Sequence, residues 1–204
     1  MRSQAITVDA HFPVVFVNDT GVRRDVIALD DRGKRMPGRS VSTGTSYTAN
    51  AYPGEVWVVT DPGGNCTAIQ TVVAPTLVIL SATRTSLVRL YAIRGSVTDA
   101  SSGAPLAGQS IFIWQPDESS CAIIGGSGSP GYVVSSITGP DGTYLVHVTA
   151  GDYKVRVRTA PVAGVAYAPQ WWRNKPASTA AQCAAADVVS VGDEMVIDFA
   201  LARQ

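Results

Sequence analysis

Short runs in which apolar and polar residues alternate recur along the chain, and they constrain its fold more than any other feature. In residues 153–158 an aromatic or aliphatic side chain alternates strictly with lysine or arginine, and in residues 195–201 Met, Ile, Phe and Leu occupy every second position. A period of two places successive side chains on opposite faces of a β-strand. We therefore expect one face of each strand to pack in a core and the other to carry its charged groups to water.

Turn-forming residues separate these runs. The chain has 19 glycines and 12 prolines. Clusters of Asn, Asp, Pro and Gly stand at residues 18–21, 31–33, 61–64, 140–142 and 150–152. These residue types tolerate positive φ or close their own Asx turns, which favours short antiparallel strands. The single helical candidate is the alanine-rich segment 176–186, which fits a short helix and a loop equally well.

Chain length and the position of the strand runs predict two domains. With 204 residues, 46% of them hydrophobic, the chain has enough material for two small cores. One series of strands ends near residue 75 and another opens near residue 87, with no Gly/Ser-rich linker between them. The expected fold class is all-β, with two tandem β-sandwich domains at residues 1–80 and 86–204.

The charge balance argues against nucleic acid and membranes as partners. The chain carries 16 basic and 16 acidic residues, a formal net charge of +0 at pH 7, so no long-range field attracts phosphates or anionic lipid. No apolar run reaches the roughly 18 residues of a transmembrane helix. We expect neither nucleic-acid binding nor membrane insertion. If the chain is exported, we expect its signal to lie outside this sequence.

Three motifs stand in order in the first half, at residues 15–20 (VFVNDT), 31–33 (DRG) and 52–64 (YPGEVWVVTDPGG). Over residues 10–80 they resemble the von Hippel-Lindau β domain, a small β-sandwich whose pocket holds a hydroxyproline of its partner. The resemblance implies that Tyr52 and Trp57 lie at binding positions. Four further pocket positions depart from the family pattern of Trp, Tyr, Ser and His: they hold Ala28, Gly38, Ala51 and Glu55. Without the Ser and His that pair with the hydroxyl, the resemblance implies a sandwich scaffold only.

Four motifs follow one another in the second half, at residues 93–99 (IRGSVTD), 103–108 (GAPLAG), 140–144 (PDGTY) and 150–155 (AGDYKV). Over residues 88–202 they are similar to the carboxypeptidase regulatory-like domain. That resemblance implies a seven-stranded prealbumin-type, Ig-like sandwich of the kind found in secreted enzymes, surface proteins and virions. We expect Gly95 to flank a strand, the Asp-Gly pair at 141–142 to turn a hairpin, and Tyr144 and Tyr153 to fill the core between the sheets.

The sequence contains few residues and motifs of the kind that enzymatic catalysis uses. It has two histidines, His11 and His147, and no Gly-x-Ser-x-Gly elbow. His147 falls on the strand face opposite Tyr144, so we expect it to face solvent. Residues 126–131 have the spacing of dinucleotide-binding glycines, but strand-like residues follow them where a helix is needed, which predicts a loop. We expect no enzymatic activity, no catalytic residue and no cofactor.

The three cysteines are Cys66, Cys121 and Cys183, and their spacing does not match a metal site. We therefore expect no bound metal. Cys121 and Cys183 fall in the same expected domain, which predicts a disulfide between them; two buried free thiols are the alternative. A disulfide would favour an oxidising compartment. Cys66 is expected to be a free, partly buried thiol.

Residues 167–174 form the strongest candidate binding segment. Adjacent residues of an extended chain point to opposite faces, so Trp171 and Trp172 cannot share one side. We expect one ring to be buried and the other to be exposed beside Tyr167 and Arg173, where it could stack on a sugar or on a side chain of a protein partner. The alternative is that the aromatic pair caps the end of the sandwich.

These patterns favour a non-catalytic binding or structural β-sandwich protein, displayed on a bacterial surface or secreted. A phage virion component and the accessory domains of a larger secreted enzyme are the alternatives. A protein partner or self-association is expected, and carbohydrate is a second candidate ligand. Fold analogy alone does not separate these classes.

Overall fold

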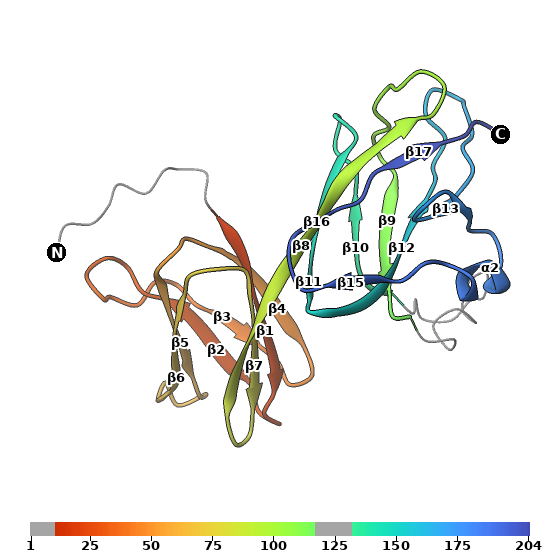
Figure 1. Ribbon diagram of the computed structural model, residues 1–204. Helices are drawn as coiled ribbons and strands as arrows, with labels where there is room; N and C mark the ends of the chain where they lie inside the picture. Colours follow the sequence, from red (N-terminus) through yellow and green to blue (C-terminus); the bar gives the residue numbers. More distant parts are fainter. Residues whose placement is uncertain (1–10, 117–131) are drawn as a thin grey trace. The chain divides into compact units, whose positions relative to one another are not determined.

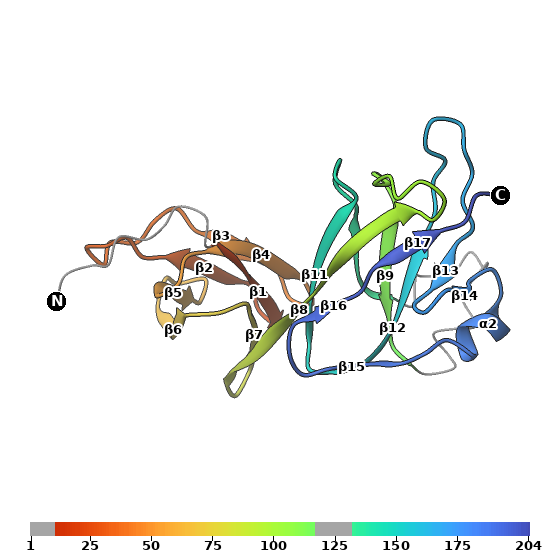
Figure 2. The same cartoon turned by 45° about the horizontal axis from the view of Figure 1, so that its top comes forward.

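The computed structural model describes residues 11–116 and 132–204, which fold into two compact units, Met1–Leu90 and Tyr91–Gln204 (Figures 1 and 2). Nearly all regular structure in the described residues is β-strand, and each unit has its own hydrophobic core between sheets. The expected all-β fold of two β-sandwiches is confirmed. The described residues include no helix with the length and apolar character that crossing a membrane requires.

The first unit is a sandwich of two sheets with the strand orders β8-β7-β1-β4 and β3-β2-β5-β6. Its strands are β1 (Phe12–Asp19), β2 (Arg24–Ala28), β3 (Arg39–Val41), β4 (Ser46–Ala51), β5 (Glu55–Thr60), β6 (Cys66–Val72), β7 (Thr76–Ser81) and the start of β8 (Thr85–Asp99). β1 runs parallel to β7, whereas the other pairs are antiparallel. The core lies between the sheets, where the Phe16 ring lies 5.3 Å from that of Trp57.

The second unit also has two layers. One sheet has the order β10-β9-β12-β13-β14 with β15 beside β12, and the other places β11, β16 and β17 beside the second part of β8. Its elements are β9 (Ser110–Trp114), β10 (Tyr132–Ile137), β11 (Thr143–Thr149), β12 (Gly151–Arg158), β13 (Gln170–Trp171), β14 (Lys175–Pro176), α2 (Ala180–Ala184), β15 (Val189–Val191), β16 (Met195–Val196) and β17 (Phe199–Leu201). Tyr144 and Tyr153 are buried in its core, as the sequence predicts.

The boundary between the units falls at residues 90/91, later than the predicted one. The segment expected to join two domains is a hairpin instead, in which β7 and β8 pair antiparallel from Thr76↔Arg89 to Leu80↔Thr85. β8 then continues without a break into the second unit. Because β8 belongs to both units, no separate linker segment joins them.

Two of the three basic side chains of β12, those of Lys154 and Arg156, are covered by the chain, contrary to the prediction from its alternation, whereas Arg158 is exposed as predicted. Lys154 is 4% exposed, and its ammonium group donates hydrogen bonds to the carbonyl oxygens of Cys183 (2.9 Å) and Ala184 (3.3 Å). Arg156 is half-buried and donates to the carbonyl oxygen of Ala177 at 2.7 Å. Backbone carbonyls of the segment after β13 thus accept hydrogen bonds from both cations, while the buried Arg156 Nε has no partner among the described residues.

Part of the predicted helical segment 176–186 is helical. α2 spans five residues and begins after Thr179, whose side chain accepts a hydrogen bond from the Gln182 backbone N–H. The Gln182 side chain accepts in return from the Thr179 N–H, which completes a capping box. Five helical residues are too few to be stable alone, so packing of Cys183 against Trp171 must hold them in place.

Gly95 was expected to flank a strand, but it lies inside β8. A Cβ at this position would approach the Ile197 carbonyl oxygen to 1.8 Å. β16 and β17 both run parallel to β8 in one register, and the Ile197 N–H donates to the Arg94 carbonyl oxygen at 2.8 Å, so the chain between them passes close against Gly95. Only glycine permits this approach.

Candidate functional site

An apolar groove of about 740 Å³ opens on the outer face of the second unit. Residues of β8, β10, β11 and β16 line it, among them Arg94, Ser136, Ile137, Thr143, Leu145 and Val196. The Tyr144 ring forms part of its wall, and the buried Tyr144 hydroxyl donates to the Ile197 carbonyl oxygen at 2.7 Å. Burial raises the pKa of Tyr144, so this hydroxyl stays protonated and fixed.

The groove lies where the two sheets of the second unit end. β10 ends one sheet and β11 ends the other, and the two strands lie side by side in both views (Figures 1 and 2). The predicted Asp-Gly turn at 141–142 exists, with Gly142 at φ 74°, but β10 and β11 belong to different sheets, so the predicted hairpin is wrong. The turn carries the chain from one layer to the other and leaves the sandwich open on this side.

Strand alternation places aliphatic side chains on the outside of the groove. Ile137 is 68% exposed, Leu145 52% and Val196 59%, while their neighbours Val146 and Ile197 are buried in the core. Exposed aliphatic side chains gathered on one face are the usual mark of a contact surface.

The walls of the groove carry little net charge. Arg94 forms an ion pair with Glu194. His147, two residues after Leu145 on the outward face where the sequence placed it, is half-buried, and burial lowers its pKa. The imidazole is therefore neutral at pH 7. The other polar groups at the surface of the groove are the hydroxyls of Ser136 and Thr143.

The aromatic segment predicted to bind a ligand is mostly part of the core. Trp171 is 0% exposed and its ring lies edge-on to Trp114 at 6.3 Å between centroids. Trp172 is partly buried against the main core of the unit, with the Arg173 guanidinium 4.4 Å above its ring. Trp171 packs in a small cluster with Trp114 and Cys183, and Trp172 packs against the main core of the unit. The two rings thus point to opposite faces, as their alternation requires, but neither face is fully exposed to solvent. An aromatic pair in this position serves packing first, and ligand contact by Trp172 and Arg173 stays a prediction.

Tyr167 is buried (6% exposed), whereas the sequence placed it at the surface. Its hydroxyl donates to the carboxylate of Asp99 at 3.0 Å, and the Arg203 Nε donates to the same oxygen at 2.7 Å. The backbone N–H and the hydroxyl of Ser101 donate to the other oxygen at 2.8 and 2.6 Å. Chiefly the Ser101 hydroxyl and then the Arg203 guanidinium hold the pKa of Asp99 far below its usual range.

The Asp99 cluster is the main polar feature that sequence reasoning missed. Residues 99–103 (DASSG) carry a local turn signal. The partner Arg203, however, stands 104 residues away and follows no motif. The cluster fixes the chain end to the β8–β9 turn, so its role is structural.

The residues that the first resemblance placed in a binding pocket separate in the structure. Trp57 is 7% exposed and belongs to the core of the first unit. Tyr52 is 38% exposed, and its ring lies 4.0 Å from the ring of His11. The Tyr52 N–H donates to the carboxylate of Glu55 at 3.0 Å. Trp57 therefore stabilises the fold, and binding by Tyr52 stays a prediction.

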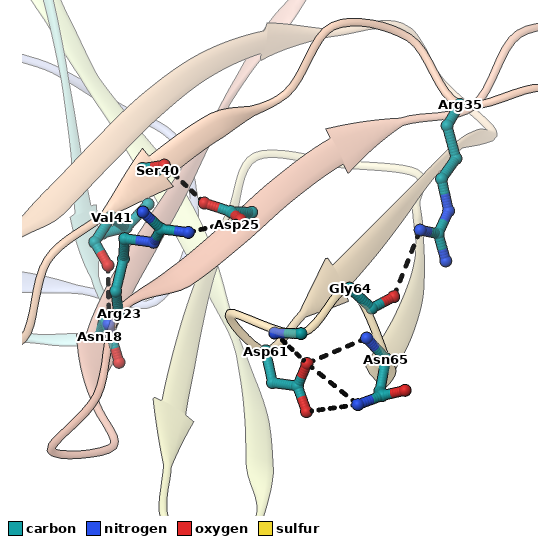
Figure 3. A network of polar contacts seen from close by, with 10 residues as sticks. Asn18, Arg23, Asp25, Arg35, Ser40, Val41, Asp61, Gly64 and Asn65 are labelled. Atoms are coloured by element: carbon teal, nitrogen blue, oxygen red, sulfur yellow. Dashed lines mark hydrogen bonds and ion pairs between the residues drawn. The ribbon is translucent and has the colours of Figure 1, made fainter.

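Polar side chains in the first unit hold its loops and strand ends (Figure 3). The Asn18 side chain, fully buried, donates to the Val41 carbonyl oxygen at 2.8 Å. The carboxylate of Asp61 accepts from the side chain and the backbone N–H of Asn65, and these bonds lower the pKa of Asp61. Arg23 pairs with Asp25 at 3.5 Å.

The structure describes two of the three cysteines, Cys66 and Cys183. Cys183 is buried and disulfide-bonded. Cys121 lies outside the described residues, so the predicted Cys121–Cys183 bridge stays a prediction. Cys66 is a free thiol and is exposed, not partly buried, because it opens the edge strand β6. The glycine-rich stretch 126–131 also lies outside the described residues, and within them no three His, Cys, Asp or Glu side chains are grouped to hold a metal.

No family model and no curated protein matches the chain. Among solved structures it is similar to a streptococcal ancillary pilin, at 12% identity and a TM-score of 0.36 over 97% of this chain and 64% of that one. It is also similar to the shaft pilin SpaA of Lactobacillus rhamnosus GG, at 12% identity and a TM-score of 0.33 over 96% and 98% of the two chains. The minor pilin of Streptococcus agalactiae is similar at 10% identity and a TM-score of 0.34, over 95% and 96%.

This chain thus spans less than two thirds of the streptococcal ancillary pilin. At such identities and TM-scores, pilus assembly remains a property of those proteins and is not transferred to this chain. The resemblances to the von Hippel-Lindau β domain and to the carboxypeptidase regulatory-like domain stay predictions.

Proposed function

We propose that this chain is a non-catalytic structural protein that acts through protein–protein contact, and that a second copy of the chain occupies the groove side of the second unit. One observation carries the proposal: β10, an uncharged strand that ends its sheet among the described residues, lies beside an open apolar groove. Edge strands pair readily with another chain unless charge, proline or cover prevents it. β10 contains no charged residue and no proline.

The sequence of β10 suits pairing with itself. When two copies run antiparallel about Ser135, Val133 opposes Ile137 of the other copy and Ser135 opposes its equivalent. Every opposed pair is then aliphatic or hydroxyl, and no charge meets a like charge. The same surface serves both partners, as in a two-fold symmetric dimer.

This arrangement would bury exposed aliphatic side chains of the groove. Ile137 and Leu145 are both more than half exposed in the single chain. Pairing at β10 brings the second copy over them and removes their apolar surface from water, which is the main favourable term in association. The paired charges of Arg94 and Glu194 impose no net charge on the occupant.

The disulfide-bonded state of Cys183 supports a site of action outside the cytoplasm. Disulfides persist in oxidising compartments and are rare where thiols are kept reduced. A secreted or surface-displayed structural protein fits this chemistry.

The experiment measures the mass of the protein in solution. A Cys66→Ser background removes association through the free exposed thiol. In that background, sedimentation equilibrium should show a monomer–dimer equilibrium, and Ile137→Asp should shift it at least tenfold toward monomer. Ile69→Asp is the matched control, since Ile69 is 62% exposed on the edge strand β6 of the first unit.

A background protein that stays monomeric up to millimolar concentration would refute the proposal. Equal loss of association in the Ile69 and Ile137 variants would refute it too, because the groove would then have no special part. A thermal melt of each variant confirms that the fold is retained.

A further inference from the structure

A second pocket, of about 230 Å³, lies at one end of the first unit and is far more polar than the groove. Its lining includes Arg24 at the start of β2, Arg84 in the β7–β8 turn, and the hydroxyl residues Thr20, Thr67, Ser81 and Thr85. Its floor is formed by Val59 and Leu80, which are 1% and 2% exposed. A rigid core therefore supports a small polar pocket that no predicted residue pointed to.

The two arginines carry charge that the surrounding protein leaves uncompensated. Arg23, next in sequence to Arg24, pairs with Asp25. For Arg24 and Arg84, in contrast, the described part of the chain supplies neither a side-chain hydrogen bond nor an ion pair. Arg24 is half-buried as a residue, so the pocket restricts where its side chain can lie. Such donors favour a ligand with oxygen acceptors.

The carboxylate of Asp61 does not neutralise the pocket arginines. The charge of Arg24 helps to lower the pKa of Asp61, so the two groups feel each other. The Asp61 oxygens, however, already accept from Gly63 and Asn65, as Figure 3 shows in part for Asn65, and Asp61 does not line the pocket. The pocket keeps two positive charges and no negative one among its lining residues.

Two of the hydroxyl groups around the arginines, those of Thr67 and Ser81, are held in place by the backbone. The Thr67 hydroxyl donates to the Val59 carbonyl oxygen at 3.2 Å. The Ser81 hydroxyl donates to the Arg84 carbonyl oxygen at 2.8 Å, and the Ser81 N–H donates to the same oxygen at 3.0 Å. These bonds fix the turn that presents Arg84. The charged donors available to a ligand are the two guanidinium groups, in a pocket whose turn is already formed.

We infer that this pocket binds an oxyanion, a carboxylate or a phosphate, carried on a small polar molecule such as an acidic sugar. Guanidinium groups match the planar, bidentate acceptors of carboxylate and phosphate. The volume admits a group of monosaccharide size and excludes larger ligands from full burial. The inference concerns the first unit and is independent of self-association through β10.

The test is a chemical-shift titration of the ¹⁵N-labelled full chain at constant ionic strength. Inorganic phosphate, glucuronate and, as the neutral counterpart, glucose are the three probes. Phosphate and glucuronate should shift the amides of residues 20, 67 and 81–85 saturably, while glucose leaves them unchanged. The tighter of the two anions identifies the carrier: glucuronate if the ring contributes, phosphate if charge alone decides.

Two variants and a control make the test specific. Arg24→Gln should weaken binding at least about tenfold, and Arg84→Gln should weaken it less because Arg84 is more exposed. Arg23→Gln is the control and should leave binding unchanged, since Arg23 has its own carboxylate partner and does not line the pocket. Absence of saturable shifts with both anions, or equal dissociation constants in all three variants, would overturn the inference.

Discussion

At the scale of single residues, buried polar groups do more to define this molecule than exposed ones. Asp99 joins the β8–β9 turn to Tyr167 and to Arg203 near the chain end. Lys154 is buried and is held by backbone carbonyls alone among the bonds described for it. Each of these side chains must keep its partners, because an unpaired buried polar group is costly.

The depressed pKa of Asp99 predicts a stability that falls in acid. Its folded pKa lies far below the unfolded value near 3.9, so ionised Asp99 stabilises the fold at neutral pH. That stabilisation is complete above the unfolded pKa and is lost as the pH falls below it toward the folded pKa. Melting temperatures measured from pH 7 to pH 2.5 should therefore drop more steeply in the wild type than in Asp99→Asn.

Arg203→Gln separates the two main causes of this effect. It removes the Nε and terminal NH2 donors of one guanidinium from Asp99 and leaves the Ser101 bonds intact. Its melting temperature at pH 7 should lie between those of the wild type and Asp99→Asn. Parallel pH profiles for the wild type and Asp99→Asn would show that this carboxylate does not drive the acid response.

Among secondary-structure elements, the sequence predicts well where strands form and poorly which segments pair with them or cover them. The alternation at residues 195–201 correctly predicts that Ile197, Phe199 and Leu201 are buried. The same reasoning fails for Lys154, because a segment remote in sequence covers the outer face of β12. Turn chemistry at 141–142 predicts a reversal, but a turn does not reveal whether the two strands pair or enter different sheets. The groove therefore had no signal in the sequence.

The two tryptophans differ in burial, and this predicts different effects on stability. Trp171→Ala removes a fully buried ring and should cost about 3–5 kcal/mol of unfolding free energy. Trp172→Ala removes a partly buried ring that stacks with Arg173 and should cost about half as much. Denaturant unfolding followed by far-ultraviolet circular dichroism gives both values.

Neither tryptophan substitution should change self-association once the variant is folded, because neither residue lines the groove. Equal costs for the two substitutions would contradict the difference in burial. Loss of association in folded Trp172→Ala would move the contact surface from the groove to the aromatic segment.

At the scale of the whole molecule, two β-sandwich units joined through one continuous strand carry two surfaces of different chemistry. The first unit offers a small pocket with two arginines, and the second offers an apolar groove beside an uncharged edge. Each surface arises where strands end or a turn crosses between layers, positions that depend on topology and not on any local motif. We propose that the groove edge joins two copies of the chain.

Cross-linking at the proposed symmetry axis shows whether two copies meet at β10. In the Cys66→Ser background, Ser135→Cys places a thiol opposite its equivalent in the paired β10 strands, at a Cα separation of about 4.5–5.5 Å that suits a disulfide. Mild oxidation should convert this variant to a covalent dimer, seen on a non-reducing gel. Thr71→Cys, an exposed position on the edge strand β6, is the control and should stay monomeric. If Ser135→Cys forms no more dimer than Thr71→Cys does, the two copies do not meet at β10.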